Sequence, residues 1–211
     1  MAEMLDEGSQ IESNTIGIFR SAATVAGGRR FSFGSLVAVG NRRGRIGIGY
    51  GRANEVPPAI EKAQKDGRKS LVNVQLKGGT IPHVVEGRYG ASKVRVVPAS
   101  PGTGVIAGAT VRAVLELAGI TDCLTKSYGS NNKKNLAKAT LDALTQLRNA
   151  DHYEEMRGVS IGRTEVDAML ERGEAAIAKP ALKPSEENAK DPDAPAAESA
   201  DADTEKKNDD A

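Results

Sequence analysis

The sequence has few aromatic residues, one cysteine and no long apolar run, and each shortage excludes a class of protein. The 211 residues include three Phe, four Tyr and no Trp. A core must therefore be built from Val, Ile, Leu and Ala, which favours small domains over one large one. The single Cys123 excludes a disulfide framework and indicates a reducing compartment. No apolar run approaches the roughly 20 residues of a membrane-spanning helix, and the acidic N-terminus lacks the basic and apolar regions of a signal peptide. We therefore expect a cytoplasmic protein that makes no membrane contact.

Net charge is also small, but the charges are separated along the chain. The sequence holds 29 Lys and Arg against 28 Asp and Glu. Residues 20–95 carry fifteen Lys and Arg and four acids, whereas residues 151–211 carry eight and seventeen. A basic body between acidic ends favours a polyanionic partner, because Lys and Arg that bind phosphates release counterions.

Composition also marks the domain organisation. In residues 174–211, 31 of 38 residues are Ala, Pro, Asp, Glu or Lys, so this segment cannot bury enough surface to offset its chain entropy. We predict that it is a disordered acidic tail. The other predicted parts are a flexible leader at 1–14, two small domains at 15–72 and 73–150, and a partly helical extension at 151–173.

The first half of the folded part is glycine-rich and predicts strands followed by a helix. β-prone runs cover Ile16–Val25, Phe31–Val39 and Arg45–Tyr50, and apolar residues at helical spacing cover Pro57–Leu71. The order is βββα. Glycines at 47, 49 and 51 alternate with larger side chains, which predicts a bare face of the third strand that something approaches closely.

The second half mixes sheet and helix again. The predicted strands are Val72–Leu76, Ile81–Glu86, Lys93–Val97 and Asp122–Tyr128. The predicted helices are Gly104–Ala118, closed by Gly119 as a C-terminal cap, and Lys133–Leu147. Neither half repeats a regular βαβ pattern, so the fold class is α+β.

Most catalytic and metal-binding patterns are absent from the sequence. Cys123 has no second cysteine, and the histidines are His83 and His152 alone, so no zinc site has the required ligand spacing. Cys123 lies in an apolar pattern, which favours a buried structural thiol; a Cys–His nucleophile pair is the alternative. The glycines of residues 44–51 do not fit a dinucleotide fingerprint, and the phosphate-loop motif is missing. We expect neither a metal nor a cofactor.

One segment keeps an enzymatic alternative open. The small residues of Pro98–Gly108 lead into the first turn of a predicted helix, and a turn of this kind at a helix N-terminus suits an anion. It holds a nucleotide phosphate or is simply a tight turn. The nearby acids Glu116 and Asp122 are not arranged as obvious magnesium ligands. A small-molecule kinase activity is therefore the alternative to a binding role.

The positive signals concern nucleic acid. Gly27 and Gly28 precede Arg29 and Arg30 in one predicted loop, and Arg42, Arg43 and Arg45 cluster in the next. Guanidinium groups bind phosphates in bidentate fashion. We place Phe31 and Phe33 in the core, so the contacts should be with the backbone and shape of structured RNA. A groove for DNA is the alternative, although no helix has the basic, capped form of a reading helix.

Three long motifs add a resemblance that covers about residues 15–150. They are VAGGRRFSFGSLVAVGNRRGRIGIGYGRANEVPPAIEKA, PASPGTGVIAGATVRAVLELAGI and KSYGSNN. With them the chain resembles the family of bacterial small-subunit ribosomal protein five. The resemblance implies a first domain like double-stranded-RNA-binding modules and a βαβ-type second domain related in fold to one class of small-molecule kinases. It implies a non-enzymatic protein that binds small-subunit ribosomal RNA, contacts ribosomal proteins four and eight, lies beside the messenger RNA entry channel and influences translational accuracy.

The resemblance also implies roles for individual residues. The family's extended loop, near the spectinomycin site, matches the segment around Gly27–Arg30, and its usual basic residue at position 26 is Ala26 here. An RNA-facing turn matches Tyr50–Ala53. Gly104 and Arg112 match the contact region with protein four. The complete expected RNA-binding set is Arg20, Gly27, Gly28, Arg29, Arg30, Arg42, Arg43, Arg45, Tyr50, Arg52, Lys126, Ser130, Asn131 and Asn132.

Overall fold

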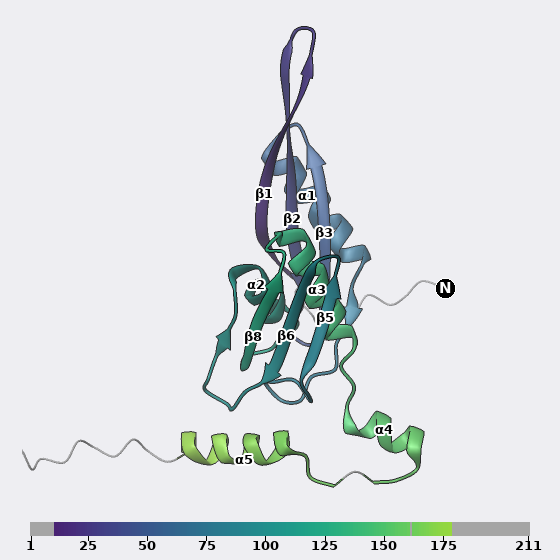
Figure 1. Cartoon of the computed structure of the whole chain (residues 1–211), viewed down its shortest axis with the longest axis vertical. Coiled ribbons are helices and arrows are strands. Elements are labelled where there is room, and N and C mark those ends of the chain that lie inside the picture. The colour runs from purple at the N-terminus through teal and green to yellow at the C-terminus, as the bar shows by residue number, and fades with distance from the viewer. Residues whose placement is uncertain (1–10, 161, 179–211) are drawn as a thin grey trace, which may run out of the picture. The chain divides into compact units, whose positions relative to one another are not determined.

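The first of two four-stranded sheets is antiparallel and carries one helix. The computed structural model describes residues 11–160 and 162–178. The sheet has the order β1-β2-β3-β4, and α1 connects its last two strands. The elements are β1 (Glu12–Val25), β2 (Gly28–Gly40), β3 (Arg45–Ala53), α1 (Val56–Lys69) and β4 (Val72–Asn73) (Figure 1). The predicted βββα order is confirmed.

The second sheet has the order β5-β6-β8-β7 and contains one parallel pair. Its strands are β5 (Val85–Tyr89), β6 (Ser92–Pro98), β7 (Val105–Ile106) and β8 (Cys123–Gly129). Helix α2 (Ala109–Ala118) connects β7 to β8, which run parallel, and α3 (Lys133–Thr145) follows β8. β7, α2 and β8 form one βαβ unit, as the resemblance implies for the second domain. The α+β class with two sheet-containing domains is confirmed, because helices accompany two separate and mainly antiparallel sheets.

Helix α1 covers one face of the first sheet at very close range. Val37 and Val39 of β2 pack there against Ala63. A Cβ atom on Gly49 would lie 1.9 Å from the Ala63 carbonyl oxygen, and one on Gly51 would lie 2.3 Å from that of Ala59. The alternating glycines therefore let the helix backbone approach the strand, so the face that the sequence predicts as bare is covered by α1.

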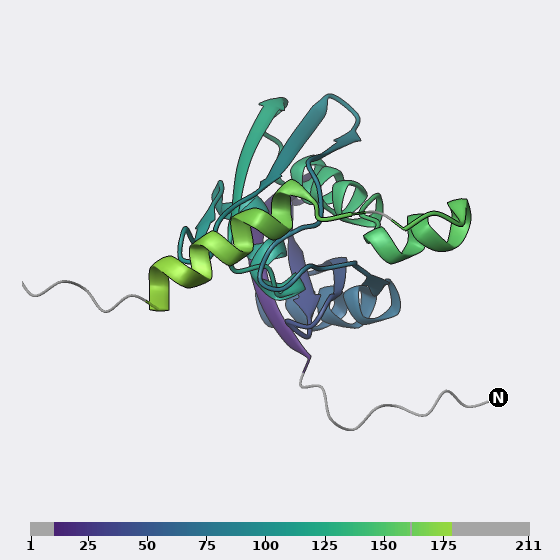
Figure 2. The same ribbon diagram turned by 90° about the horizontal axis from the view of Figure 1, so that it is seen from below.

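The opposite face of the first sheet belongs to the main core. Leu36, Ala38 and Ile46 lie there in one cluster with Val114 and Leu115 of α2. The helix contacts all three long strands of the first sheet and also packs against α3. The layers thus follow the order second sheet, α2 and α3, first sheet, α1, as the end view in Figure 2 shows. One apolar core joins the two halves.

The loop between β2 and β3 seals the C-terminal end of α2. The backbone N–H of Arg42 donates to the Leu117 carbonyl (2.9 Å) and that of Gly44 to the Ala118 carbonyl (2.8 Å). The N–H of Gly119 donates to Glu116, and the C-terminal cap at Gly119 has φ +98° as predicted. Carbonyls that a helix end leaves without intrahelical partners are therefore satisfied here, partly by the other half of the chain.

Several predicted boundaries in the second half are wrong. The helix begins at Ala109 and not at Gly104, because Gly102 (φ +87°) and Gly104 (φ +76°) adopt left-handed conformations. Val105–Ile106 instead pairs with β8. The strand predicted at Val72–Leu76 is limited to β4. The strand predicted at Ile81–Glu86 starts at Val85. The other predicted strands and helices are present with end shifts of a few residues.

Two further helices follow the second sheet: α4 (Ala150–Arg157) and α5 (Glu165–Ala178). At the start of α5, the Thr164 hydroxyl and backbone N–H both donate to the Asp167 carboxylate, at 2.8 and 3.0 Å. Lys77 forms an ion pair with Asp167 (2.5 Å) and also donates to Thr164. The hydrogen bonds from Lys77 and Thr164 lower the pKa of Asp167 to about 2. These contacts attach α5 to the second half.

The ends of the chain differ from the predicted boundaries. Strand β1 begins at Glu12, inside the predicted leader, and α5 extends past residue 173, into the predicted tail. Residues 1–10 of the predicted leader and 179–211 of the predicted tail lie outside the described residues. Among those described, no helix is long and apolar enough to cross a membrane.

Candidate nucleic-acid interface

The β1–β2 hairpin extends beyond the third strand of its sheet. Strand β3 pairs with β2 only from Phe33 inward, so the outer part of the hairpin is a two-stranded ribbon (Figure 1). Arg29 and Arg30 lie in β2, paired with Thr24 and Ala23, and not at the tip of an open loop as predicted. The connection is a tight turn at residues 26–27. The exposed segment is therefore a regular, preformed ribbon.

One face of this ribbon combines guanidinium groups with an exposed aromatic ring. Arg29, Phe31 and Phe33 are spaced two residues apart along β2 and therefore share one face. Arg20 of β1 lies directly opposite Phe33 and so belongs to the same face. The Arg20 guanidinium lies 3.7 Å from the centre of the Phe31 ring. Phe31 is 45 % exposed, so its predicted place in the core is wrong, and Phe33 is half-buried. Both Arg20 and Phe31 are thus available at the surface.

The other face carries a second pair of arginines. Arg30 and Ser32 share this face of β2, and Arg52 reaches it from β3. The Arg52 guanidinium donates to the Ser32 hydroxyl (2.6 Å) and to the Ser21 hydroxyl (3.1 Å). These hydrogen bonds hold Arg52 across three strands. The ribbon therefore presents cations on both faces.

The three arginines at the β2–β3 connection, Arg42 and Arg43 in the loop and Arg45 at the start of β3, are not equivalent. Arg42 has φ +54° and forms an ion pair with Glu12 (2.8 Å), so its side chain is already engaged. Arg43 and Arg45 are exposed, and neither forms an ion pair within the described residues. The Asn41 side chain accepts from the backbone N–H groups of both (2.9 and 3.0 Å), which fixes the loop. Arg43 and Arg45 remain candidates for phosphate contacts.

Tyr50 lies within β3, which continues to Ala53, and not in a turn as the resemblance implies. The Lys134 ammonium of α3 lies 3.5 Å from the centre of the Tyr50 ring, and the Tyr50 backbone N–H donates to Asp66 of α1. Because the ring contacts a helix of the second half, Tyr50 joins the two halves of the molecule. It is 41 % exposed, so part of the ring still faces solvent.

The predicted RNA-binding residues of the second half differ in whether their side chains face outward or hold the loop before α3. Lys126 is exposed on β8, opposite Arg95. The Ser130 backbone is held by Ala91 and Ser92, and the Asn132 side chain accepts from the Lys134 backbone N–H as the cap of α3. Ser130 and Asn132 therefore shape the loop, whereas Lys126 and the exposed Asn131 present side chains outward.

The open face of the second sheet carries cations that are not among the residues predicted from the sequence. Arg88, Lys93 and Arg95 are exposed and alternate along β5 and β6 with residues that point to the core, such as Val94. Arg95 lies 4.0 Å from Glu86, a weak surface pair. The alternation within residues 93–97 is the signal that identifies this basic face.

The predicted protein-contact residues lie on either side of β7. The Gly104 backbone N–H donates to Asp122 (2.9 Å) in the turn before β7, so Gly104 does not begin a helix. Arg112 is exposed on α2 and lines a shallow pocket with Arg42 and Glu116. Each residue is accessible to a partner, but they are on separate elements.

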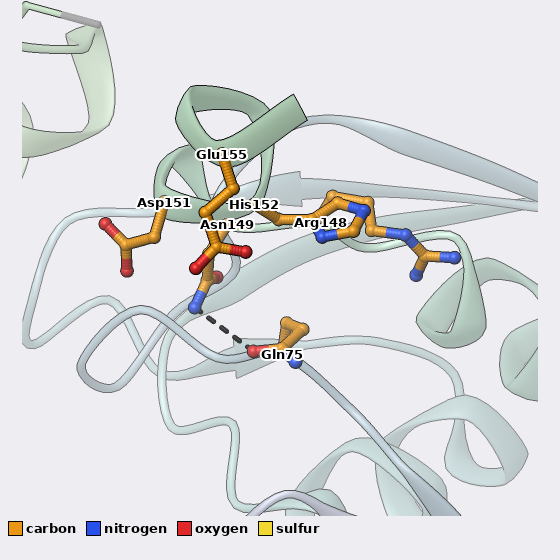
Figure 3. Close-up of a pocket in the computed structure, with 6 residues that line it drawn as sticks. All are labelled: Gln75, Arg148, Asn149, Asp151, His152 and Glu155. Atoms are coloured by element: carbon orange, nitrogen blue, oxygen red, sulfur yellow. Dashed lines mark hydrogen bonds between the residues drawn. The ribbon is translucent and has the colours of Figure 1, made fainter. Parts of the chain in front are cut away.

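The remaining reactive groups form no catalytic cluster in the described parts of the chain. Burial, with a smaller effect of Asp122, raises the pKa of the Cys123 thiol to about 11. His83 accepts weakly from the Arg148 backbone N–H, and no group of three or more metal-binding side chains occurs among these residues. A polar pocket lies between Gln75 and the start of α4, where Asn149 donates to Gln75 (Figure 3). None of the predicted site residues lines it.

Comparison with known proteins gives matches to both halves. A family model described as ribosomal protein S5, N-terminal domain, matches residues 11–75, and one described as ribosomal protein S5, C-terminal domain, matches residues 87–157. The small ribosomal subunit protein uS5 of Rhodopirellula baltica is 56% identical over 143 residues, 68% of this chain and 81% of the relative. That of Thermus thermophilus is 54% identical over 149 residues, 71% of this chain and 92% of the relative.

Proposed function

Because the chain belongs to the ribosomal protein S5 family, we propose that it is a structural, non-catalytic component of the small ribosomal subunit in the cytoplasm. Its relatives carry the name of a small ribosomal subunit protein. The ligand in this proposal is small-subunit ribosomal RNA. The predicted domain limits, 15–72 and 73–150, and the RNA-binding residue set are part of the same proposal.

The observation that best supports RNA binding is the two-faced hairpin. Arg20 and Arg29 lie on one face of the ribbon, and Arg30 and Arg52 on the other. A thin ribbon with guanidinium groups on both sides suits a space between two phosphate backbones, since each face meets a separate strand. Arg43, Arg45 and the basic face of the second sheet extend the same charge pattern.

The finer parts of the proposal concern the neighbours in the subunit. We place ribosomal protein four at the surface that includes Gly104 and Arg112, with ribosomal protein eight and messenger RNA near the entry channel as further contacts. Through the contact with protein four the chain influences translational accuracy. Arg112 supports this assignment because its exposed side chain is not needed for the core of α2.

The central experiment changes Arg29 and Arg30 together to Ala. The affinity for small-subunit ribosomal RNA falls, and the slope of log K against log salt decreases by about one to two, because each lost phosphate contact removes about 0.9 from it. The melting temperature is unchanged, since both side chains are exposed. Exposed Lys65 and Arg68 of α1, changed together to Ala, are the charge-matched control and leave the slope closer to that of the wild type.

Cosedimentation with the small subunit through a salt wash tests the function as a whole. Retention on the subunit supports the proposal. Release at low salt together with saturable binding of a nucleotide would replace it with the kinase-like alternative.

For the accuracy role, Arg112→Leu should raise misreading in a reporter while the variant is fully incorporated into subunits; wild-type error rates contradict that role. Gly104→Arg is harder to interpret, because Gly104 has φ +76° and a residue with a side chain is strained in that conformation.

A further inference from the structure

A small pocket lies where the first turns of α2 and α3 meet the end of β8. Its lining comes from three separate elements and the loop before α3. The residues are Gly108, Ala109, Thr110, Val111, Ser127, Asn131, Lys133 and Leu136. Of these, Asn131 alone belongs to the predicted RNA-binding set, so the pocket is largely a separate feature of the fold.

The α2 end of this pocket has unused hydrogen-bond donors. The helix is capped by Gly108, which offers no side chain, and no acidic residue lies in its first turn. The first intrahelical bond runs from the Arg112 N–H to the Gly108 carbonyl (2.8 Å). The N–H groups of Ala109, Thr110 and Val111 have no partner within the described residues. Such a helix end attracts negative charge.

Thr110 gives a second and independent indication of a ligand. The residue is 7 % exposed, and within the described chain its hydroxyl makes no hydrogen bond. Thr110 lines the pocket. In the described residues, the fully buried side-chain atoms that lack a hydrogen-bond partner are the Ser35 hydroxyl and the Asn149 carbonyl oxygen, and the Thr110 hydroxyl is not one of them. The Thr110 hydroxyl therefore keeps accessible surface in a residue that lines the pocket, and it has no protein partner to compete with a ligand.

The charge of the lining selects an anion. Lys133 is the one charged residue among the lining residues, and it forms no ion pair in the part of the chain that the structure describes. Ser127 and Asn131 add exposed polar side chains. A phosphate group accepts several hydrogen bonds and pairs with an ammonium, so it matches this set of donors.

Gly108 leaves space for close approach without being required by the fold. Its φ of −66° and ψ of 154° are open to any residue. A Cβ atom at this position would meet nothing within 4 Å. The contrast is with Gly49, where α1 occupies the space. The bare helix start is thus accessible to a ligand.

We propose that this pocket binds a backbone phosphate of the RNA, held by the α2 N-terminus, the Thr110 hydroxyl and Lys133. The proposal rests on the proposed function, because the RNA supplies the phosphate. It also gives a role to the turn at Pro98–Gly108, which the sequence leaves between a phosphate site and a plain turn. A free nucleotide has the same chemistry and is distinguished by experiment.

Two substitutions test the site in the full chain without removing its fold. Gly108→Asp places a carboxylate where it caps α2, which favours the helix but competes with an anion. Thr110→Val removes a hydroxyl that has no partner and keeps the shape. Both variants should melt at or above the wild-type temperature. Gly162→Asp is the charge-matched control, because a Cβ there also meets nothing within 4 Å and the residue does not line the pocket.

The readout is affinity for small-subunit ribosomal RNA over a series of salt concentrations. Gly108→Asp should weaken binding roughly tenfold or more, as expected for a lost charge-assisted contact, and lower the salt slope by about 0.9. Thr110→Val should weaken binding by a smaller factor, about threefold, with little change in slope. Wild-type affinity and slope in Gly108→Asp overturn the inference while the proposed function stands. Failure of the wild type itself to bind RNA overturns the proposed function.

A second arm separates the two sources of phosphate. Inorganic phosphate and ATP are added to the 15N-labelled full chain, and amide shifts of Ala109–Val111 are followed. Weak, millimolar shifts with both ligands, absent in Gly108→Asp, support a phosphate subsite that RNA fills. Saturable ATP binding well below millimolar, with RNA affinity unaffected by the variant, overturns the RNA assignment.

Discussion

The backbone N–H of Gly44 donates to the carbonyl of Ala118 over 2.8 Å, across the boundary between the two halves of the chain. Gly44 ends the loop between two strands of the first sheet, and Ala118 ends a helix of the second half. With the parallel bond from Arg42 to Leu117, this contact uses the carbonyls of one half to fix a loop of the other. The two family-matched halves therefore share hydrogen bonds as well as apolar surface.

Gly119→Ala should destabilise the joined structure. Gly119 has φ +98°, and a Cβ atom there would lie 2.3 Å from the Arg42 carbonyl oxygen, so the helix end and the loop must separate. We expect a loss of about 2–4 kcal/mol in unfolding free energy, measured by urea denaturation. Both halves should still unfold in one transition. Gly27→Ala is the control, because a Cβ there meets nothing within 4 Å.

Gly49→Ala tests whether the glycine face serves the helix or a ligand. The new methyl group would lie 1.9 Å from the Ala63 carbonyl oxygen and 2.4 Å from the Gly67 nitrogen, both backbone atoms of α1. The melting temperature should therefore fall by several degrees, corresponding to about 2 kcal/mol or more. RNA affinity of the folded protein should remain close to that of the wild type. Lower affinity at an unchanged melting temperature would show that the face meets RNA.

Ser35→Ala should be neutral or stabilising. The Ser35 side chain is fully buried beneath α1, and its hydroxyl has no hydrogen-bond partner in the described structure. Removing an unsatisfied buried hydroxyl relieves a desolvation cost of about 1 kcal/mol. Chemical denaturation measures the change, and Thr140→Val is the contrast, because the Thr140 hydroxyl donates to the Leu136 carbonyl (2.8 Å) and its loss should destabilise.

The attachment of α5 should depend on pH in the acidic range. Hydrogen bonds from Lys77 and Thr164 lower the pKa of Asp167 from 3.8 to about 2. A lowered pKa means that the stabilising effect is present above about pH 4 and is lost as the pH falls through about 2. The protection of the amides in residues 165–176, that is the exchange rate relative to the intrinsic rate at the same pH, should fall over that range before the core unfolds. In Asp167→Asn the exchange should be fast at neutral pH and lose this dependence.

Local sequence rules predicted the elements whose structure depends on neighbouring residues. The C-terminal cap at Gly119, the helix after Lys133 and the βββα order follow from turn residues and apolar spacing, and all are confirmed. The predicted start of α2 at Gly104 is wrong because Val105–Ile106 pairs with β8, a strand that lies further along the chain. Periodicity within residues 104–118 carries no information on that pairing.

In the candidate site, too, features set by neighbouring residues were predicted and features set by contacts between distant segments were not. The arginine-rich segments were recognised from composition, but their places on two opposite faces depend on the register between β1 and β2. The exposure of Phe31 was missed because β3 does not cover the outer part of the hairpin. The pocket at Gly108 was recognised only as a turn, since Lys133 and Ser127 reach it from other elements.

The shared core also restricts how this chain can change over generations. Leu36, Ala38 and Ile46 of the first half meet Val114 and Leu115 of the second in one close-packed cluster. A larger side chain at one of these positions requires a smaller one across the boundary, so substitutions must arise in compensating pairs. A hybrid that joins the first half of this chain to the second half of a distant relative should therefore fold poorly, although each half alone has a recognisable pattern.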